Sequence, residues 1–394
     1  MFMSIIVIMN KSIFRKSTKI SLYLMLFLSF VFFSSEVFAK TDKKDTVTGE
    51  PLQDIVVISQ NDWLIIPHLY YKPETQFAYG VVFLTYFQDI IMSIPPIKLR
   101  PTTLAITFTH TQNDQFIFQV FPEFYFFRDK YHIKNEFQYM NYPDKFYGIG
   151  QDTTENDREE YTSRIFSFKN IIERAFIPGF YIGLLYHIDV RKTTQAQDGG
   201  LIDSNLLPGA DKGLVSGLGF TINYDNRDDI LFTRDGSYAN FTITQYSKYI
   251  KSDFDYINVT FDYRFFEPFW FSHVLAVQFI SGYIHGQAPF YLLSQMGGAK
   301  LMRGLYEGRY RDRNVIVVHA EYRFPLFWRF IGCGFAGAGE VAQTIREFNK
   351  EHIIYTWGGG LRFKLKKDQT LNARLDIGFS KNFTGVYVTI GEAI

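Results

Sequence analysis

The sequence contains one cysteine, Cys333, which excludes an internal disulfide and a cysteine-rich metal site. Its eight histidines are scattered along the chain, and their spacing does not match that of a metal site. Basic residues are not in excess, because 41 Lys and Arg stand against 40 Asp and Glu. This balance argues against a nucleic-acid partner. We therefore expect no metal, no cofactor and no nucleic acid.

The chain also lacks the local patterns of an enzyme active site. Ser216-Gly217 and Ser281-Gly282 are not set in the strand-to-helix turn of a hydrolase nucleophile. The run Gly297-Gly298-Ala299-Lys300 lacks the remainder of a phosphate loop and the helix that follows one. We therefore predict that the protein is not an enzyme, and we expect no catalytic residue.

The first 39 residues predict a cleaved secretory signal peptide. Four basic residues precede an apolar stretch at 20–33, and Ala39 provides the small residue for cleavage before Lys40. An uncleaved membrane anchor is the alternative, although the apolar stretch is short for a spanning helix. Residues 40–65 are polar and turn-rich, and we interpret them as a short lead-in to one domain over 66–394.

After the signal, apolar and polar residues alternate in many runs, and aromatic residues make up 18% of the chain. Residues 257–265 and 371–380 alternate strictly, with charged residues and Asn on one face. A period of two is typical of strands. Two interpretations fit: a secreted soluble protein, or a membrane β-barrel with a charged, wet lumen and aromatic girdles.

We count fifteen such runs between residues 77 and 394. Many are as long as the roughly 9–11 residues that a tilted strand needs to cross a bilayer. A barrel with both termini on one side needs an even number of strands. We therefore predict an all-β fold, a transmembrane antiparallel β-barrel of 16 strands, with the hidden strand near 146–150 or 287–293.

Several short motifs in the second half of the chain are informative when they are taken together. A polar loop contains Arg303-Gly304, and a strand with Glu321 and Arg323 on one face follows it. The others are the Asp225-Asn226-Arg227-Asp228 turn, Phe335 with Gly337 and Gly339, and the Gly360-Leu361-Arg362 strand. As a set, these motifs resemble the BamA/TamA-type outer-membrane proteins, also called bacterial surface-antigen barrels.

The resemblance implies a barrel in the outer membrane of a bacterial cell, with one long loop folded into its lumen. Larger members carry periplasmic POTRA modules before the barrel, and the segment 40–65 is too short for one. We therefore expect a barrel-only member with a short periplasmic lead-in. Expected partners are outer-membrane lipid, unfolded outer-membrane protein or lipid clients, and an oligomer or a periplasmic partner.

The resemblance also implies a lock inside the lumen. Arg303 would reach the barrel wall and pair with Glu321, and Gly304 would let the loop turn sharply. Gly337 stands where relatives have an Asp, so Glu321 is the expected remaining partner of Arg303. The alternative is an ordinary surface loop. The supporting residues on neighbouring strands would be Arg323, Phe335, Gly337, Gly339 and Arg362.

A separate motif is expected to shape a turn. The side chains of Asp225, Arg227 and Asp228 can bond to nearby backbone groups and so hold the chain in a tight connection.

Relatives use the junction between the first and last strands as a lateral gate. We place Tyr79 and Gly80 in the first strand and Gly385 and Tyr387 in the last. Glycine weakens strand pairing, and an open edge templates another strand. We predict that the barrel assists insertion or translocation of proteins or lipids through this seam, gated by the lumenal loop. The alternative is a passive pore for small solutes, which the charged lumen face favours.

Overall fold

The computed structural model describes residues 57–91, 97–98, 100–127, 129–230, 232–365 and 372–394. The predicted signal peptide, 1–39, and the first part of the predicted lead-in, 40–56, lie outside these residues. The chain divides into two compact units, and the unit made of residues 58–90 and 96–394 contains the fold described below. Within the described ranges, no helix is long and apolar enough to span a bilayer.

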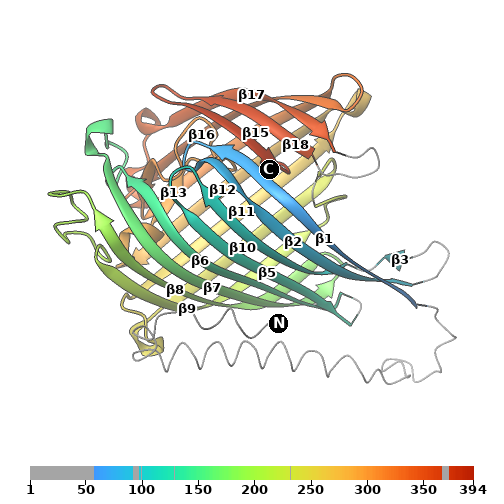
Figure 1. The fold of residues 1–394 in the computed structure, drawn as a ribbon, viewed down its shortest axis with the longest axis horizontal. Helices are drawn as coiled ribbons and strands as arrows, with labels where there is room; N and C mark the ends of the chain where they lie inside the picture. Colours follow the sequence, from blue (N-terminus) through green and yellow to red (C-terminus); the bar gives the residue numbers. More distant parts are fainter. Residues whose placement is uncertain (1–56, 92–96, 99, 128, 231, 366–371) are drawn as a thin grey trace. The chain divides into compact units, whose positions relative to one another are not determined.

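Sixteen antiparallel strands form one closed sheet, as predicted (Figure 1). Each strand pairs with the next one along the chain, and β19 returns to pair with β1. A two-residue strand, β3 (Ile97–Lys98), belongs to the same sheet. The sixteen strands are β1 (Val57–Lys72), β2 (Gln76–Ile91), β4 (Thr102–Thr111), β5 (Phe116–Phe126), β6 (Tyr131–Phe146), β7 (Glu159–Ile177), β8 (Phe180–Ala196), β9 (Lys212–Asp225), β10 (Gly236–Tyr246), β11 (Tyr256–Pro268), β12 (Val274–Gly286), β15 (Asn314–Pro325), β16 (Phe330–Ala342), β17 (Ile354–Lys364), β18 (Asn372–Phe379) and β19 (Thr384–Ile390).

The fifteen predicted runs correspond to fifteen of these strands, from β2 to β19. The hidden strand is β1, so its predicted position near 146–150 or 287–293 is wrong. The sequence of β1 conceals it because Gln60-Asn61-Asp62 and Pro67 interrupt a run in which Trp63-Leu64-Ile65 are consecutive apolar residues. Strand structure therefore begins within the segment predicted as lead-in.

Alternation places polar side chains inside the barrel and apolar ones outside. In β18, Arg374 and Asp376 are buried, whereas Leu375 and Ile377 are exposed. A strand in lipid has its backbone groups bonded to its neighbours and directs apolar side chains outward. The pattern of β18 matches this requirement.

The barrel has long connections at one end, which we call the loop end: 147–158, 197–211, 247–255, 287–313 and 343–353. Short 3-10 helices occur in the connections: η3 (Glu155–Asp157), η4 (Lys248–Ile250), η5 (Trp270–Ser272), η6 (Phe290–Leu292), η7 (Ile345–Glu347) and η8 (Lys350–His352). Within 287–313, β13 (Ser294–Met296) and β14 (Tyr310–Asp312) form a two-stranded ribbon. We call residues 297–309, which join them, the lumenal loop.

Candidate functional site

The backbone of the lumenal loop rests directly on β18. Gly304 has a φ of +103°, and a Cβ added there would lie 2.6 Å from the carbonyl oxygen of Phe379. A Cβ added to Gly378 would lie 2.6 Å from the backbone of Arg303. Such distances are too short for any side chain, so only glycine fits on either side of this contact.

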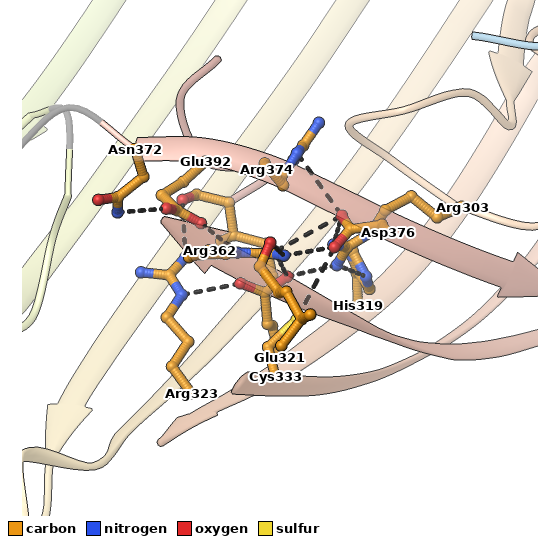
Figure 2. A network of polar contacts seen from close by, with 12 residues as sticks. Arg303, His319, Glu321, Arg323, Cys333, Arg362, Asn372, Arg374, Asp376 and Glu392 are labelled. Atoms are coloured by element: carbon orange, nitrogen blue, oxygen red, sulfur yellow. Dashed lines mark hydrogen bonds and ion pairs between the residues drawn. The ribbon is translucent and has the colours of Figure 1, made fainter. Parts of the chain in front are cut away.

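Arg303, at the tip of the loop, is fully buried at 0% exposure and lies between two carboxylates (Figure 2). Its Nη2 donates to Glu321 Oε2 at 2.6 Å, and its Nη1 donates to Asp376 Oδ2 at 2.5 Å. The guanidinium carbon also lies 3.6 Å from the centroid of the Phe335 ring, a cation–π distance. The structure therefore brings the predicted pair, Arg303 and Glu321, together.

The charge of Arg303 is maintained by these partners. Burial alone would lower the pKa of Arg303, because it disfavours the charged form. The carboxylates of Glu321 and Asp376 outweigh burial and raise that pKa. The contact is therefore an ion pair on both sides, of the charge-assisted kind that is short and directional.

Arg303 has a second carboxylate partner, Asp376, whereas Glu321 was predicted as its one remaining partner. Asp376 comes from β18, whereas Glu321 comes from β15, so the loop arginine joins two separate strands. Asp376 belongs to the polar face of the alternating run 371–380, and that face is the sequence signal that identifies it as inward-facing.

Gly337 and Gly339 serve the loop by leaving space. A Cβ on Gly337 would lie 3.6 Å from Met302 Cγ, and one on Gly339 would lie 2.8 Å from Met302 Sδ. Met302 is itself fully buried, in a cluster with Val317 and Val341. The two glycines of β16 thus accommodate the loop residue that precedes Arg303.

Two further predicted residues, Arg362 and Arg323, extend the network (Figure 2). Arg362 donates from Nη1 to Asp376, from Nη2 to Glu321 at 3.1 Å, and from Nε to Glu392 at 3.0 Å. Arg323 Nε donates to Glu321 Oε1 at 2.8 Å. The barrel wall therefore holds the carboxylates in place for Arg303 through arginines of β15 and β17.

The lumenal loop also contacts both sides of the junction between β19 and β1. The N–H of Gly304 donates to the hydroxyl of Tyr387 on β19 at 3.0 Å. The N–H of Glu307 donates to Glu74 Oε1, in the turn between β1 and β2, at 2.8 Å. One loop is therefore bonded to the last strand and to the first hairpin.

The first strand differs from the prediction. Tyr79 and Gly80 lie in β2, where they pair with His110 and Thr109 of β4. The strand opposite β19 is β1, with Tyr71 facing Val388. The prediction misplaced the seam by one strand because β1 was not recognised from its sequence.

Of the two predicted residues in β19, Tyr387 is buried and faces the loop, whereas Gly385 pairs with Gly378 of β18.

The Asp225 motif forms a tight turn after β9. Asp225 binds the Arg227 guanidinium through both oxygens, at 2.8 and 2.9 Å. Asp228 Oδ1 accepts from the backbone N–H groups of Asp229, Arg234 and Asp235. The side chains thus bond to nearby backbone, as the residue types allow.

Two cavities lie outside this network. One of about 310 Å³ is lined mostly by polar residues of β6, β7, β8, β10 and β11, including Glu136, Lys169 and His187. Another of about 620 Å³ opens at the loop end, beside Gln151, Asp312 and Glu347. In the part of the chain that the structure describes, no three His, Cys, Asp or Glu side chains are grouped as metal ligands would be.

Comparison with known proteins identifies one family. Residues 102–382 match the Omp85 superfamily domain. No curated protein matches the sequence.

Among solved structures, the fold is similar to that of BamA from Haemophilus ducreyi lacking POTRA domains 1–3 (TM-score 0.57, 14% identity), over 84% of this chain and 70% of that one. It is also similar to CdiB from Acinetobacter baumannii (TM-score 0.51, 11% identity), over 89% of this chain and 64% of that one. A third similar structure is CdiB from Escherichia coli (TM-score 0.51, 9% identity), over 84% of this chain and 63% of that one. The match thus spans less than two thirds of each CdiB chain. At these identities the likeness shows the fold alone.

Proposed function

The chain belongs to the Omp85 superfamily, and from this premise we propose that it assists insertion or translocation of proteins or lipids at the outer membrane through the seam between β1 and β19. Family membership supports an outer-membrane location and this class of activity. The seam and its control by the lumenal loop are argued below from the contacts of this chain.

The observation that carries the proposal is the short overlap of the two seam strands. Counting from the pair Tyr71–Val388, Ile390 at the end of β19 lies opposite Leu69. β19 therefore reaches only residues 69–72 of β1, although β1 has 16 residues. The part of β1 before Leu69 runs past the end of β19.

Within that part of β1, residues 63–66 are apolar on both faces. Leu64 and Ile65 are consecutive, so their side chains point to opposite sides of the strand, and they are 52% and 56% exposed. A strand edge with exposed apolar residues is a template for pairing with another strand. We infer that a client segment adds to β1 here and separates it from β19.

The lumenal loop supports a role in control. Its bonds to Tyr387 and Glu74 lie on the two sides of the seam, and Arg303 anchors it to the barrel wall. Separation of β1 from β19 moves these two contacts apart, so an open seam requires the loop to release at least one of them. The loop therefore favours the closed seam.

A disulfide across the seam tests the proposal. Cysteines at Tyr71 and Val388 replace directly opposed residues, whose Cα separation in antiparallel strands suits a disulfide. The assay is the folding rate of a urea-unfolded outer-membrane barrel in lipid vesicles that contain the protein. We expect the oxidised Tyr71→Cys/Val388→Cys variant to lose any acceleration of folding, and the reduced variant to recover it.

The matched control joins β18 to β19, a junction that is not expected to open. Ile377 and Val386 are directly opposed there, and both side chains are exposed, as is Val388 of the seam pair. The oxidised Ile377→Cys/Val386→Cys variant should keep full activity. Equal activity of the oxidised seam variant and the wild type would show that the seam does not open in this function.

A further inference from the structure

The buried network contains one more arginine than it has carboxylates to match. Four arginines, Arg303, Arg323, Arg362 and Arg374, share the three carboxylates of Glu321, Asp376 and Glu392. Three of these arginines make ion pairs of 3.0 Å or shorter. Arg374 is the exception, because its nearest carboxylate oxygen, on Asp376, is 3.5 Å away and already accepts from Arg303. Arg374 is therefore the arginine whose charge is least well matched, whereas Arg323 also donates to the backbone oxygen of Ile394 at 3.3 Å.

Arg374 also has an unused donor. Its Nε donates to Thr389 Oγ1 at 2.9 Å and its Nη2 to the carbonyl of Ala299 at 3.2 Å. Its Nη1 has no hydrogen-bond partner among the described residues, although the side chain is only 3% exposed. A buried donor without a partner carries a desolvation cost that a bound acceptor would remove.

A second free cation lies beside it. Lys300 follows Ala299, the residue bonded to Arg374, and makes no ion pair within the described part of the chain. Loss of surrounding water inside the lumen, and then the positive charges of Lys72, Arg264 and Arg374, lower the pKa of Lys300, whereas Glu307 acts in the opposite direction. The charges of Lys72, Arg264 and Arg374 therefore lie near enough to Lys300 to act on it. The Lys300 side chain itself keeps an exposed surface.

Of these neighbours, Arg264 is matched by Asp262 at 2.7 Å. Lys72 makes no ion pair within 4 Å among the described residues, although its charge acts weakly on Glu74, and its ammonium lies over the Tyr70 ring.

The cations lie directly behind the seam. By the register of the Tyr71–Val388 pair, Lys72 is opposite Tyr387 in β19. Thr389, which binds Arg374, is two residues further along β19. The three cations thus come from β1, β18 and the lumenal loop. Lys72 and Arg374 lie on the inner face on either side of β19, and Lys300 follows the loop residue that is bonded to Arg374.

We propose that Lys72, Lys300 and Arg374 form a lumenal anion site that binds a phosphate group, the headgroup phosphate of an anionic lipid that enters at the seam. Three neighbouring cations suit an anion with several acceptor oxygens, and the free Nη1 of Arg374 can donate a charge-assisted hydrogen bond to one of those oxygens. The entry of lipid rests on the proposed function, whereas the phosphate site rests only on these side chains.

Binding to the full-length barrel in zwitterionic detergent tests the site. The probes are inorganic phosphate and the soluble short-chain lipid dihexanoyl phosphatidic acid, measured by calorimetry at constant ionic strength. We expect saturable binding of one equivalent. The Lys300→Gln variant, which breaks no ion pair, should bind about tenfold more weakly, the effect of losing one charge-assisted hydrogen bond.

The control is Lys169→Gln, which removes the same charge from the cavity lined by β6, β7, β8, β10 and β11. It should leave affinity unchanged, and an equal loss in both variants would overturn the proposal, as would the absence of saturable binding. Binding of inorganic phosphate alone would support the anion site and reject lipid as its source. No step opens the seam in this assay, so its outcome is independent of the disulfide experiment.

Discussion

Arg303 illustrates how a single residue of a loop can hold a barrel wall together. Its two ion pairs reach β15 and β18, and the same carboxylates bind arginines of β15 and β17. Removing a partner from a buried pair leaves an uncompensated charge, which costs more than the pair itself contributes. Arg303 is therefore the residue whose loss should disturb both the loop and the wall.

We predict that Arg303→Ala lowers the free energy of unfolding by about 3–5 kcal/mol, because Glu321 and Asp376 each lose a buried cation. Urea unfolding of the detergent-solubilised protein, monitored by tryptophan fluorescence, measures this free energy. The control is Arg158→Ala, whose ion pair with Glu160 is half-exposed, and it should cost no more than about 1 kcal/mol. Equal effects of the two substitutions would contradict the buried lock.

Glu74 gives the loop contact a dependence on pH. It is 2% exposed, and its Oε2 has no hydrogen-bond partner among the described residues. Burial, followed by repulsion from Glu307, raises the pKa of Glu74 from 4.5 to about 7, with Lys72 acting weakly in the opposite direction. The folded protein therefore keeps a proton between pH 4.5 and 7 that the unfolded chain has lost.

The stability contributed by protonated Glu74 is complete below pH 4.5 and is lost as the pH rises through about 7. We predict that wild-type protein loses roughly 2–3 kcal/mol of unfolding free energy between pH 5 and 8 relative to Glu74→Gln. Urea unfolding of both proteins at several pH values measures this difference. Parallel pH profiles of the two proteins would be incompatible with a buried, titrating Glu74.

Among elements, the lumenal loop and β18 are in direct backbone contact at Gly304 and Gly378. We predict that Gly378→Ala lifts the loop, because the added Cβ meets the backbone of Arg303 at 2.6 Å. Hydrogen–deuterium exchange should then be faster for the amides of residues 298–309, including Gly304, which loses its bond to Tyr387.

Gly334→Ala is the matched control, since a Cβ on Gly334 of β16 meets nothing within 4 Å, and exchange in the loop should not change. Unchanged loop exchange in Gly378→Ala would show that the loop does not rest on β18.

The elements that the sequence predicted are those whose signal is local. Alternation within 257–265 and 371–380 needs only neighbouring residues, and it located strands and their inward charges. β1 was missed because its apolar residues are consecutive and Pro67 interrupts it. Asp376 was not paired with Arg303 because 73 residues separate them, and their contact depends on where the loop meets β18 in space.

For the molecule as a whole, we expect the lumenal loop to limit how much of the lumen is open. A barrel of 16 strands is wide enough for an aqueous channel. We predict that the wild type gives a small, flickering current in planar bilayers, and that replacing residues 298–309 with a Gly-Ser linker of equal length gives a larger, steady conductance. A large, steady wild-type conductance would instead support the passive pore.

The pairing of Tyr71 with Val388 has a consequence for the order of assembly. The two residues are 317 positions apart in the chain (388 − 71), whereas every other junction in the barrel joins strands that are neighbours in sequence. Closing the longest segment carries the largest loss of chain entropy and brings the fewest paired residues in return. We therefore expect the hairpins to form first and the cylinder to close last, after the neighbouring strands β15 to β18, which hold the partners of Arg303, have already paired.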